Sequence, residues 1–269
     1  GRRPPGPVRA GGQQRRRAQR VRERRHFASP RRGTVRVAHP VAALRQYGQS
    51  VWLDFIRRSL ITSGELKRLV DDDGLGGVTS NPAIFEKAID GSADYATAIQ
   101  EISDRHPGLD AKALYERLAI KDIQDAADVL RPVYDRTGSQ DGYVSLEVSP
   151  DLANDTNGTL SEARQLWTTV ARPNVMIKVP ATPAGLPAIR TLISEGINVN
   201  VTLLFSIESY EAVADAYLSG LELFLRNGAE RDRIASVASV ASFFVSRIDT
   251  LVDDQLRRRL ENSAIDHYQ

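Results

Sequence analysis

Residues 175–205 contain the pattern that decides the fold. They include two apolar runs, VMIKV at Val175 to Val179 and INVNVTLLF at Ile197 to Phe205, and Pro180 follows the first run. Short runs of this kind, rich in β-branched residues, are typical of strands buried in a parallel sheet. Four comparable runs lie elsewhere in the chain, at Val51 to Phe55, Gly77 to Asn81, Tyr143 to Val148 and Ile234 to Val240.

Stretches with a helical pattern separate these runs, and some of their starts carry recognisable signals. Thr62 to Glu65 and Thr159 to Glu162 each fit a capping box, in which a threonine and a glutamate satisfy free N–H groups at a helix start. Asn81-Pro82 should end the second strand, because proline lacks the N–H that a ladder needs. We expect helices over most of 83–135, over 207–226 and over 246–262.

Alternating strands and helices predict βαβ units and a parallel sheet, which leaves two architectures. An open dinucleotide-binding sheet should carry a G-x-G-x-x-G turn after its first strand. Residues 56–59, which follow Phe55, contain no glycine. We therefore predict an α/β fold of the TIM (β/α)8 barrel class, with about six of the eight βα units present within residues 41–269.

Composition excludes several classes of protein. The 269 residues include no cysteine, so the chain has no disulfide, no thiolate nucleophile and no cysteine metal site. No apolar run approaches the ~20 residues of a membrane-spanning helix. The four histidines lie outside every predicted strand end, and no cluster of His, Asp and Glu has metal-ligand spacing. We expect neither a metal nor an organic cofactor.

The first 36 residues differ in charge from the rest of the chain. They hold thirteen of the 36 basic residues, all arginine, and one of the 34 acidic residues, so this segment carries +12 and the remainder −10. Few apolar residues and no sustained period predict disorder over residues 1–40. Three roles remain open for this segment: a nucleic-acid-binding tail, an organelle transit peptide, or a linker or non-native leader.

Polar residues occupy one face of the predicted strands, close to their carboxyl ends. Side chains alternate between the two faces of a strand, so Asn198, Asn200 and Thr202 share one face while their odd-numbered neighbours are apolar. Ser145 and Glu147 likewise share a face of their own strand. Barrel enzymes build their active sites at the carboxyl ends of the strands, so we expect the active site there.

Lys178 is the most informative single residue, because it lies inside an apolar strand run. A charged amine is costly to bury, and desolvation favours the neutral amine that can form a Schiff base with a carbonyl. The alternative is a structural role, in which Lys178 pairs with Glu147 or Asp54.

Asp54 and Glu147 lie on other predicted strands and supply the carboxylates that Schiff-base chemistry needs. Carbon–carbon cleavage through an iminium requires a general base that moves protons at a hydroxyl and at water. For Asp54 the alternative is a cap or a salt bridge. Arg247 follows the sixth strand, where barrel enzymes often bind a substrate phosphate, and its alternative is a surface arginine paired with Asp249 or Asp253.

Six segments, in the correct order within residues 41–262, resemble transaldolase, a class I Schiff-base aldolase, and in particular the longer bacterial type found in actinobacteria. Each motif alone is weak, whereas six in sequence make a specific signal. The segments are Gln49 to Asp54, Gly77 to Pro82, Val144 to Val148, Val175 to Thr182, Gly196 to Phe205 and Ser242 to Asp249.

The resemblance implies four catalytic residues. Lys178 would be the Schiff-base lysine, and Asp54 would take the proton of the C4 hydroxyl during carbon–carbon cleavage. Glu147, together with Thr202, would hold the water that shuttles protons.

The resemblance also implies five substrate-binding residues. Asn81, Asn200 and Ser242 would bind the retained dihydroxyacetone unit, and Arg247 would bind the phosphate. Phe244 fits transaldolase, because the related fructose 6-phosphate aldolases tend to carry tyrosine at that place.

The implied reaction is a transferase step of the pentose phosphate pathway in the cytoplasm. A dihydroxyacetone unit would pass from fructose 6-phosphate or sedoheptulose 7-phosphate to erythrose 4-phosphate or glyceraldehyde 3-phosphate. The expected partners are these sugar phosphates, not a membrane and not a nucleic acid, and the chain would be a monomer or a homodimer.

The sequence departs from the family at its end. Transaldolases close an eight-stranded barrel, so we expect two more strands and a second phosphate-binding arginine beyond residue 269. A longer protein in which this chain is fused to another enzyme is also an open alternative. Two alternative functions remain. One is an aldolase that releases free dihydroxyacetone, and the other is an inactive chain whose arginine-rich arm binds nucleic acid.

Overall fold

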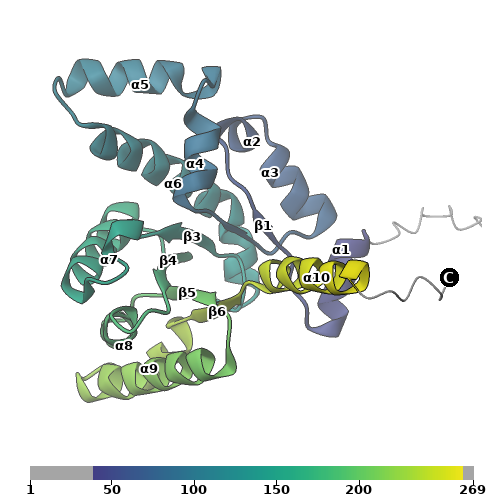
Figure 1. Ribbon diagram of the computed structural model, residues 1–269. Helices are drawn as coiled ribbons and strands as arrows, with labels where there is room; N and C mark the ends of the chain where they lie inside the picture. Colours follow the sequence, from purple (N-terminus) through teal and green to yellow (C-terminus); the bar gives the residue numbers. More distant parts are fainter. Residues whose placement is uncertain (1–38, 263–269) are drawn as a thin grey trace, which may run out of the picture. The chain divides into compact units, whose positions relative to one another are not determined.

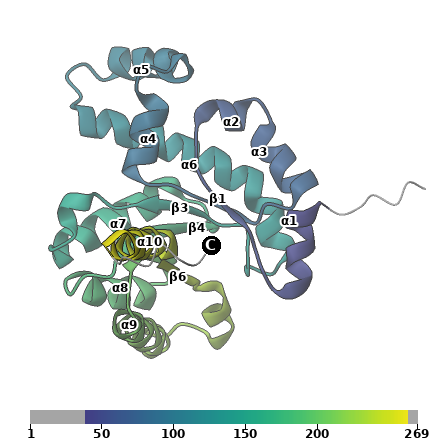
Figure 2. The ribbon, with the colours of Figure 1, turned by 45° about the vertical axis from the view of Figure 1, so that its right-hand side comes forward.

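The computed structural model describes residues 39–262. Six strands form one parallel sheet whose spatial order follows the chain (Figure 1). The strands are β1 (Trp52–Asp54), β2 (Gly77–Thr79), β3 (Val144–Glu147), β4 (Val175–Pro180), β5 (Val199–Leu204) and β6 (Ser239–Phe243). A doubly wound sheet reverses its strand order, whereas a barrel wall does not. The sheet curls as a half-barrel, in agreement with the predicted fold class (Figure 2).

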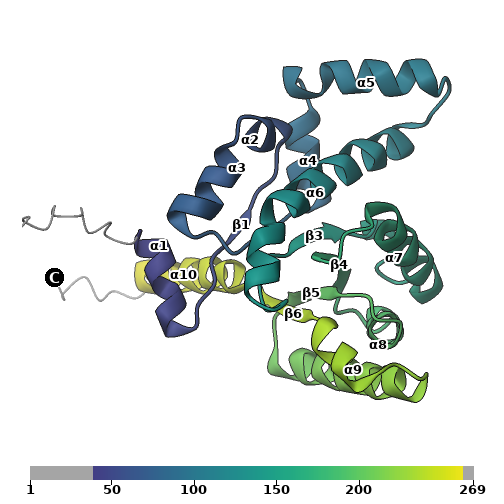
Figure 3. The same ribbon diagram turned by 180° about the vertical axis from the view of Figure 1, so that it is seen from behind.

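Helices join the strands and cover their outer face (Figures 1 and 3). They are α1 (Pro40–Ala43), α2 (Arg58–Thr62), α3 (Glu65–Arg68), α4 (Pro82–Ile89), α5 (Ala93–Arg105), α6 (Ala111–Arg136), α7 (Thr156–Val170), α8 (Gly185–Ser194), α9 (Ile207–Arg226) and α10 (Val245–Asn262), with 3-10 turns η1 (Leu44–Tyr47), η3 (Pro150–Leu152) and η4 (Arg231–Ser236) and the π-helical turn η2 (Leu69–Asp73). The expected helices at 207–226 and 246–262 are confirmed as α9 and α10, and 83–135 contains three helices. The predicted disordered segment lies outside the described residues as far as residue 38.

Both predicted capping boxes are wrong. Thr62 ends α2, and α3 begins after Gly64, whose φ of 83° breaks the helical path before Glu65. Thr159 already lies inside α7, because Asp155 caps that helix by accepting a hydrogen bond from the Gly158 N–H at 3.0 Å. In both places the Thr-x-x-Glu spacing is present in the sequence, but the geometry of a capping box is not present in the structure.

The sixth strand also lies later than predicted. The run at 234–240 begins in η4, and β6 starts only at Ser239. Its carboxyl end is therefore Phe243, directly before Phe244 and α10.

The two faces of the middle strands separate as their alternation predicts. Val144, Ile177, Val199 and Val201 are fully buried in the main core with the helices on the outer face. Below the polar inner face, at the amino ends of the strands, the rings of Trp52, Tyr143 and Tyr134 form a second cluster with Met176. Gly77 makes room for this cluster, because a Cβ there would lie 2.5 Å from the Trp52 ring. Side chains therefore fill the inner side of the sheet at the amino ends of its strands.

The two ends of the sheet are less covered. Within the described residues β1 and β6 each pair on one side only. Helix α10 leaves β6 away from α7, α8 and α9 (Figure 1). Its apolar stripe, formed by Ile248, Leu251, Val252, Leu256 and Leu260, is 37–67% exposed. None of the helices in this part of the chain has the length and apolar character that crossing a membrane requires.

Candidate active site

A pocket of about 530 Å³ lies at the carboxyl ends of the strands. Its lining includes eight of the nine predicted site residues, contributed by or directly after β1 to β6, and the ninth, Asn200, lies beneath it. The lining residues are Asp54, Thr79, Asn81, Ala83, Glu147, Lys178, Thr202, Leu203, Ser242, Phe243, Phe244, Val245, Ser246 and Arg247.

Strand register aligns the central residues. Glu147 on β3 lies opposite Lys178 on β4, which lies opposite Asn200 on β5. Their side chains share the inner face, because neighbours at one level of a sheet point the same way. Thr202 lies one level higher, opposite Pro180. The pocket floor is thus a row of an acid, an amine and an amide.

The Lys178 amine makes one hydrogen bond and one ion pair. Its Nζ lies 2.6 Å from the carbonyl oxygen of Ser80 and 3.3 Å from Glu147 Oε2. The residue is only 6% exposed and still reaches the pocket. Of the two carboxylates considered for a structural pair, Glu147 is the one that contacts the amine. The bond to Cε and these two contacts occupy three of the four tetrahedral directions around Nζ. One direction remains for a bond to a substrate, so Lys178 can pair with Glu147 and still act as a nucleophile.

Thr202 brings an unpartnered polar atom to the same pocket. Its hydroxyl oxygen is buried and makes no hydrogen bond to any described residue. Buried hydroxyls almost always have a partner, and ordered water often supplies it. Together with the carboxylate of Glu147, this hydroxyl is therefore suited to hold a small polar molecule.

Asn200 joins three strands through its amide. Its Nδ2 donates to Ser145 Oγ at 3.1 Å, and its Oδ1 accepts from Ser242 Oγ at 2.7 Å. Of these three residues only Ser242 lines the pocket. Asn200 therefore supports the position of Ser242 from below.

Asn81 has a structural task as well as a place in the pocket. It caps α4, because its Oδ1 accepts from the Ile84 N–H at 2.9 Å. With the oxygen engaged there, the NH₂ of the amide is the group that can donate to a ligand.

Aromatic and basic groups form the opposite wall, at the start of α10. The Arg247 guanidinium carbon lies 4.6 Å from the centre of the Phe244 ring, a cation–π distance. Phe244 also contacts Phe205, with ring centres 5.8 Å apart. Arg247 is thus placed over an aromatic surface at the pocket mouth, where its five donors suit an anionic group.

The sequence is similar to those of known proteins. The profile of the Transaldolase/Fructose-6-phosphate aldolase family matches residues 51–268. The chain belongs to this family. It is 49% identical over 223 residues to "Transaldolase 2" of Nostoc sp. PCC 7120, covering 83% of this chain and 57% of that protein. It is 48% identical over 229 residues to "Transaldolase" of Trichodesmium erythraeum, covering 84% and 58%.

A third relative gives the same result. The "Transaldolase" of Saccharopolyspora erythraea is 49% identical over 214 residues, which are 80% of this chain and 57% of that protein. The chain therefore spans a little over half the length of the curated relatives it matches. The predicted family and the predicted barrel fold are confirmed.

Sequence reasoning missed several features of this transaldolase-family pocket. Leu203 lines it because β5 carries a bulge, in which one extra residue between Val201 and Leu204 faces β6. Leu203 takes a φ of 63°, which strict alternation does not anticipate. Ser80 was missed too, since it contributes a backbone carbonyl, for which no side-chain pattern exists.

A smaller cavity of about 300 Å³ lies next to the pocket, and Glu147 lines both. In it Lys112 contacts Glu162 at 3.1 Å, and burial, followed by the charge of Glu147, raises the pKa of Tyr115 to about 12. Tyr115 therefore stays a neutral phenol near neutral pH.

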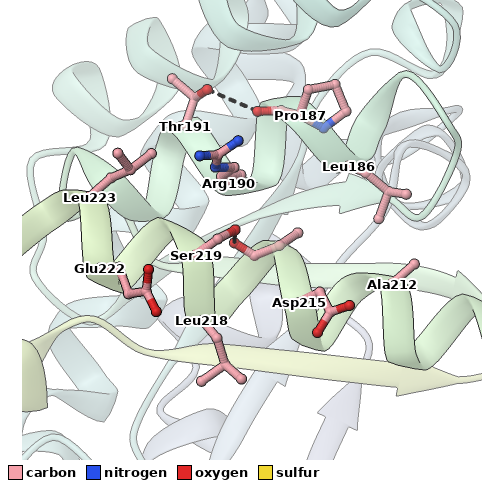
Figure 4. Close-up of a pocket in the computed structure, with 11 residues that line it drawn as sticks. Leu186, Pro187, Arg190, Thr191, Ala212, Asp215, Leu218, Ser219, Glu222 and Leu223 are labelled. Atoms are coloured by element: carbon pink, nitrogen blue, oxygen red, sulfur yellow. Dashed lines mark hydrogen bonds between the residues drawn. The ribbon is translucent and has the colours of Figure 1, made fainter.

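Another hollow lies between α8 and α9 and contains none of the predicted site residues (Figure 4). Exposed groups such as Arg190 and Glu222 line it. Across residues 39–262 no group of three or more His, Asp or Glu side chains could hold a metal ion.

Proposed function

We propose that the chain carries the chemistry of a transaldolase. It would transfer a dihydroxyacetone unit from fructose 6-phosphate or sedoheptulose 7-phosphate to erythrose 4-phosphate or glyceraldehyde 3-phosphate, through a Schiff base on Lys178. The observation that carries this proposal is the placement of the Lys178 amine between Ser80 O and Glu147 Oε2 at the pocket wall.

Formation of the Schiff base uses Lys178, Glu147 and Thr202. The neutral amine attacks the C2 ketone, and the carbonyl π pair moves to oxygen, which takes a proton. The nitrogen then loses a proton, the hydroxyl leaves as water, and the nitrogen lone pair forms the iminium. A water held between Glu147 and the free Thr202 hydroxyl would carry these protons, since both groups line the pocket.

Cleavage uses Asp54. Its carboxylate takes the proton of the C4 hydroxyl, the C3–C4 bond breaks, and the electron pair moves through C3 toward the iminium nitrogen to form an enamine. The aldose phosphate leaves. The enamine then attacks the aldehyde of a second aldose phosphate, and Asp54 returns its proton to the new alkoxide. Water then adds at C2 of the new iminium and the ketose leaves, which frees the Lys178 amine and returns the proton that formation of the first iminium took up. The cycle therefore closes without a cofactor.

The remaining residues would hold the substrate. Asn81 can donate through its amide NH₂, and Ser242 is supported by Asn200, so both suit the hydroxyls of the retained unit. Arg247, over Phe244, suits the phosphate. Such substrates are intermediates of the pentose phosphate pathway, so we propose that the protein acts in that pathway, in the cytoplasm.

Borohydride trapping tests the proposal. Reduction makes an iminium permanent, so incubation with fructose 6-phosphate and borohydride, followed by peptide mass mapping, identifies the amine that attacked. We expect a dihydroxyacetone-sized adduct on the Lys178 peptide. Lys178→Met should abolish it, and Lys112→Met, which removes the amine of the neighbouring cavity, should not. A folded chain without an adduct on Lys178 would refute the proposal.

An assay with an acceptor aldehyde distinguishes a transferase from an aldolase. With erythrose 4-phosphate present, a transferase forms sedoheptulose 7-phosphate faster than it releases free dihydroxyacetone. Release of free dihydroxyacetone as the main product would instead identify an aldolase.

A further inference from the structure

Ser80 leaves the sheet in an unusual way. Strand β2 pairs with β3 so that Thr79 lies opposite Ser145, and the Val78 N–H donates to the Tyr143 carbonyl at 2.9 Å. A continued parallel ladder would direct the Ser80 N–H to the Ser145 carbonyl and the Ser80 carbonyl to the Glu147 N–H. The strand ends at Thr79 instead.

Two side chains occupy the places of those ladder bonds. The Ser80 hydroxyl donates to the Ser145 carbonyl at 2.7 Å, and Lys178 Nζ donates to the Ser80 carbonyl at 2.6 Å. Ser80 is fully buried. Its hydroxyl thus satisfies a buried carbonyl of β3, and its own carbonyl is free to accept the amine from β4.

This arrangement fixes the direction of the amine. A neutral amine has two N–H bonds and one lone pair. One N–H is directed to the Ser80 carbonyl, and Glu147 Oε2 lies 3.3 Å from the nitrogen on a second side. The lone pair is then left the direction of the pocket that Lys178 lines. An attacking amine needs its lone pair aimed at the carbonyl carbon.

We propose that Ser80 is a positioning residue, whose hydroxyl bond to Ser145 holds its carbonyl where it orients the Lys178 amine for attack. The inference rests on the proposed function, because it assigns Ser80 a part in the Schiff-base step. It predicts a loss in the rate of attack and no loss in substrate binding.

The size of the effect follows from torsional freedom. Each freed torsion of the lysine side chain has about three staggered positions, so the productive fraction falls roughly threefold for each one. Release of the Cε–Nζ torsion and the one before it lowers the rate roughly tenfold.

The test measures borohydride trapping of the Lys178 peptide over a range of fructose 6-phosphate concentrations. For Ser80→Ala we expect a saturating rate roughly tenfold lower and a half-saturating concentration within about twofold of wild type. Ser80→Thr, which retains the hydroxyl, should restore the rate to within about threefold of wild type. If the Ala variant does not fold, Ser80→Cys, whose thiol is a weaker donor, should show an intermediate loss.

A matched control separates positioning from stability. Thr159 is also buried, and its hydroxyl donates to the Leu152 carbonyl at 3.0 Å, away from Lys178. Thr159→Val removes an equivalent bond, and we expect its trapping rate to equal that of wild type. Equal losses in Ser80→Ala and Thr159→Val would overturn the inference, as would an unchanged rate in Ser80→Ala or Ser80→Cys, or a change in half-saturation alone.

Failure of the proposed function gives a different result. In that case folded wild type forms no fructose 6-phosphate adduct. Ser80 is then judged by reductive methylation with formaldehyde and cyanoborohydride, with methylation of Lys112 as the internal standard. A roughly threefold lower methylation of Lys178 in Ser80→Ala would support its orienting role, and an unchanged or higher ratio would overturn it.

Discussion

The middle of the sheet and its β6–α10 end contribute to one pocket but are held in different ways. Strands β3, β4 and β5 have outer faces that are almost fully buried under helices. In contrast, α10 exposes all five residues of its apolar stripe. The middle supplies Lys178 and Glu147, and the other end supplies Arg247.

This difference separates two tasks. An attacking amine and its proton carriers must be placed within a fraction of an ångström, which dense packing on both faces provides. A phosphate can be held by a long, charged side chain that adapts to it. We therefore expect attack by Lys178 to depend on the covered region and phosphate binding on the uncovered one, and each variant below tests one side of that contrast.

The largest effect is expected in the covered region, for Glu147→Gln. Loss of the carboxylate removes the proton carrier beside Lys178, so trapping with fructose 6-phosphate should slow by roughly 10²- to 10⁴-fold. The measurement is the rate at which the adduct forms at saturating substrate. Glu116→Gln, in the neighbouring cavity, is the control and should retain the wild-type rate. A Glu147→Gln variant that traps as fast as wild type would contradict the assignment of Glu147 as the proton carrier.

The next effect compares stability directly. Ile177 is fully buried on the outer face of β4, so Ile177→Ala should lower the free energy of unfolding by about 3 kcal/mol. Leu256 on α10 is 50% exposed, so Leu256→Ala should cost less than about 0.5 kcal/mol. Urea unfolding measures both. Similar losses in the free energy of unfolding at the two positions would show that the apolar stripe on α10 is covered in solution. The contrast between the covered middle and the exposed α10 would then be wrong.

A smaller effect is expected for Arg247→Ala. Loss of a charged hydrogen bond to phosphate should raise the half-saturating concentration of fructose 6-phosphate roughly 10- to 100-fold. Trapping with dihydroxyacetone, which has no phosphate, should not change. Arg257→Ala, on the same helix and paired with Asp254, is the control. Equal losses with both ketones would mean that Arg247 supports the pocket and does not bind phosphate.

The smallest effect concerns the surface of the covered region. Arg172, before β4, lowers the pKa of Asp128 on α6 through hydrogen bonds of 2.6 and 3.0 Å. A carboxyl with a lowered pKa in the folded state stabilises it above its unfolded pKa of about 3.9, and this stabilisation is lost as the pH falls through the folded pKa. Because the pair is exposed to solvent, Asp128→Asn should cost only about 0.5 kcal/mol at pH 7.

That cost should shrink as the pH falls from about 3.9 through the folded pKa of Asp128, because the carboxylate is protonated, and it should shrink in 1 M salt, because the ion pair is screened. Urea unfolding at pH 7 and pH 2.5 measures it. A cost at pH 2.5 as large as that at pH 7 would mean that the Asp128 side chain stabilises by packing and not by charge.

The sequence predicted best what depends on alternation and packing. Lys178, Glu147 and Thr202 were placed on an inner face because their neighbours are apolar, and the strands have that alternation. The sequence was a poorer guide to where helices begin, because local spacing was the only evidence there. The Thr62 and Thr159 signals did not account for Gly64 and Asp155, which set where α3 and α7 begin.

The start of β6 was misplaced for a related reason. Residues 234–240 form one small, apolar run, and nothing in it separates the 3-10 turn that ends at Ser236 from the strand that starts at Ser239. The carbonyl of Ser80 was beyond reach because a backbone acceptor leaves no trace in side-chain types. Sequence patterns thus located the polar residues but not the backbone that orients them.

The backbone at Leu203 bears on any attempt to make this chain more stable by redesign. A side chain at a φ of 63° costs about 1–3 kcal/mol, and glycine would remove most of that cost. A stability-guided search would therefore select Leu203→Gly early. The same exchange would delete a wall of the pocket and loosen the bulge beside Thr202. Position 203 is a place where selection for thermal resistance and selection for turnover would choose different residues.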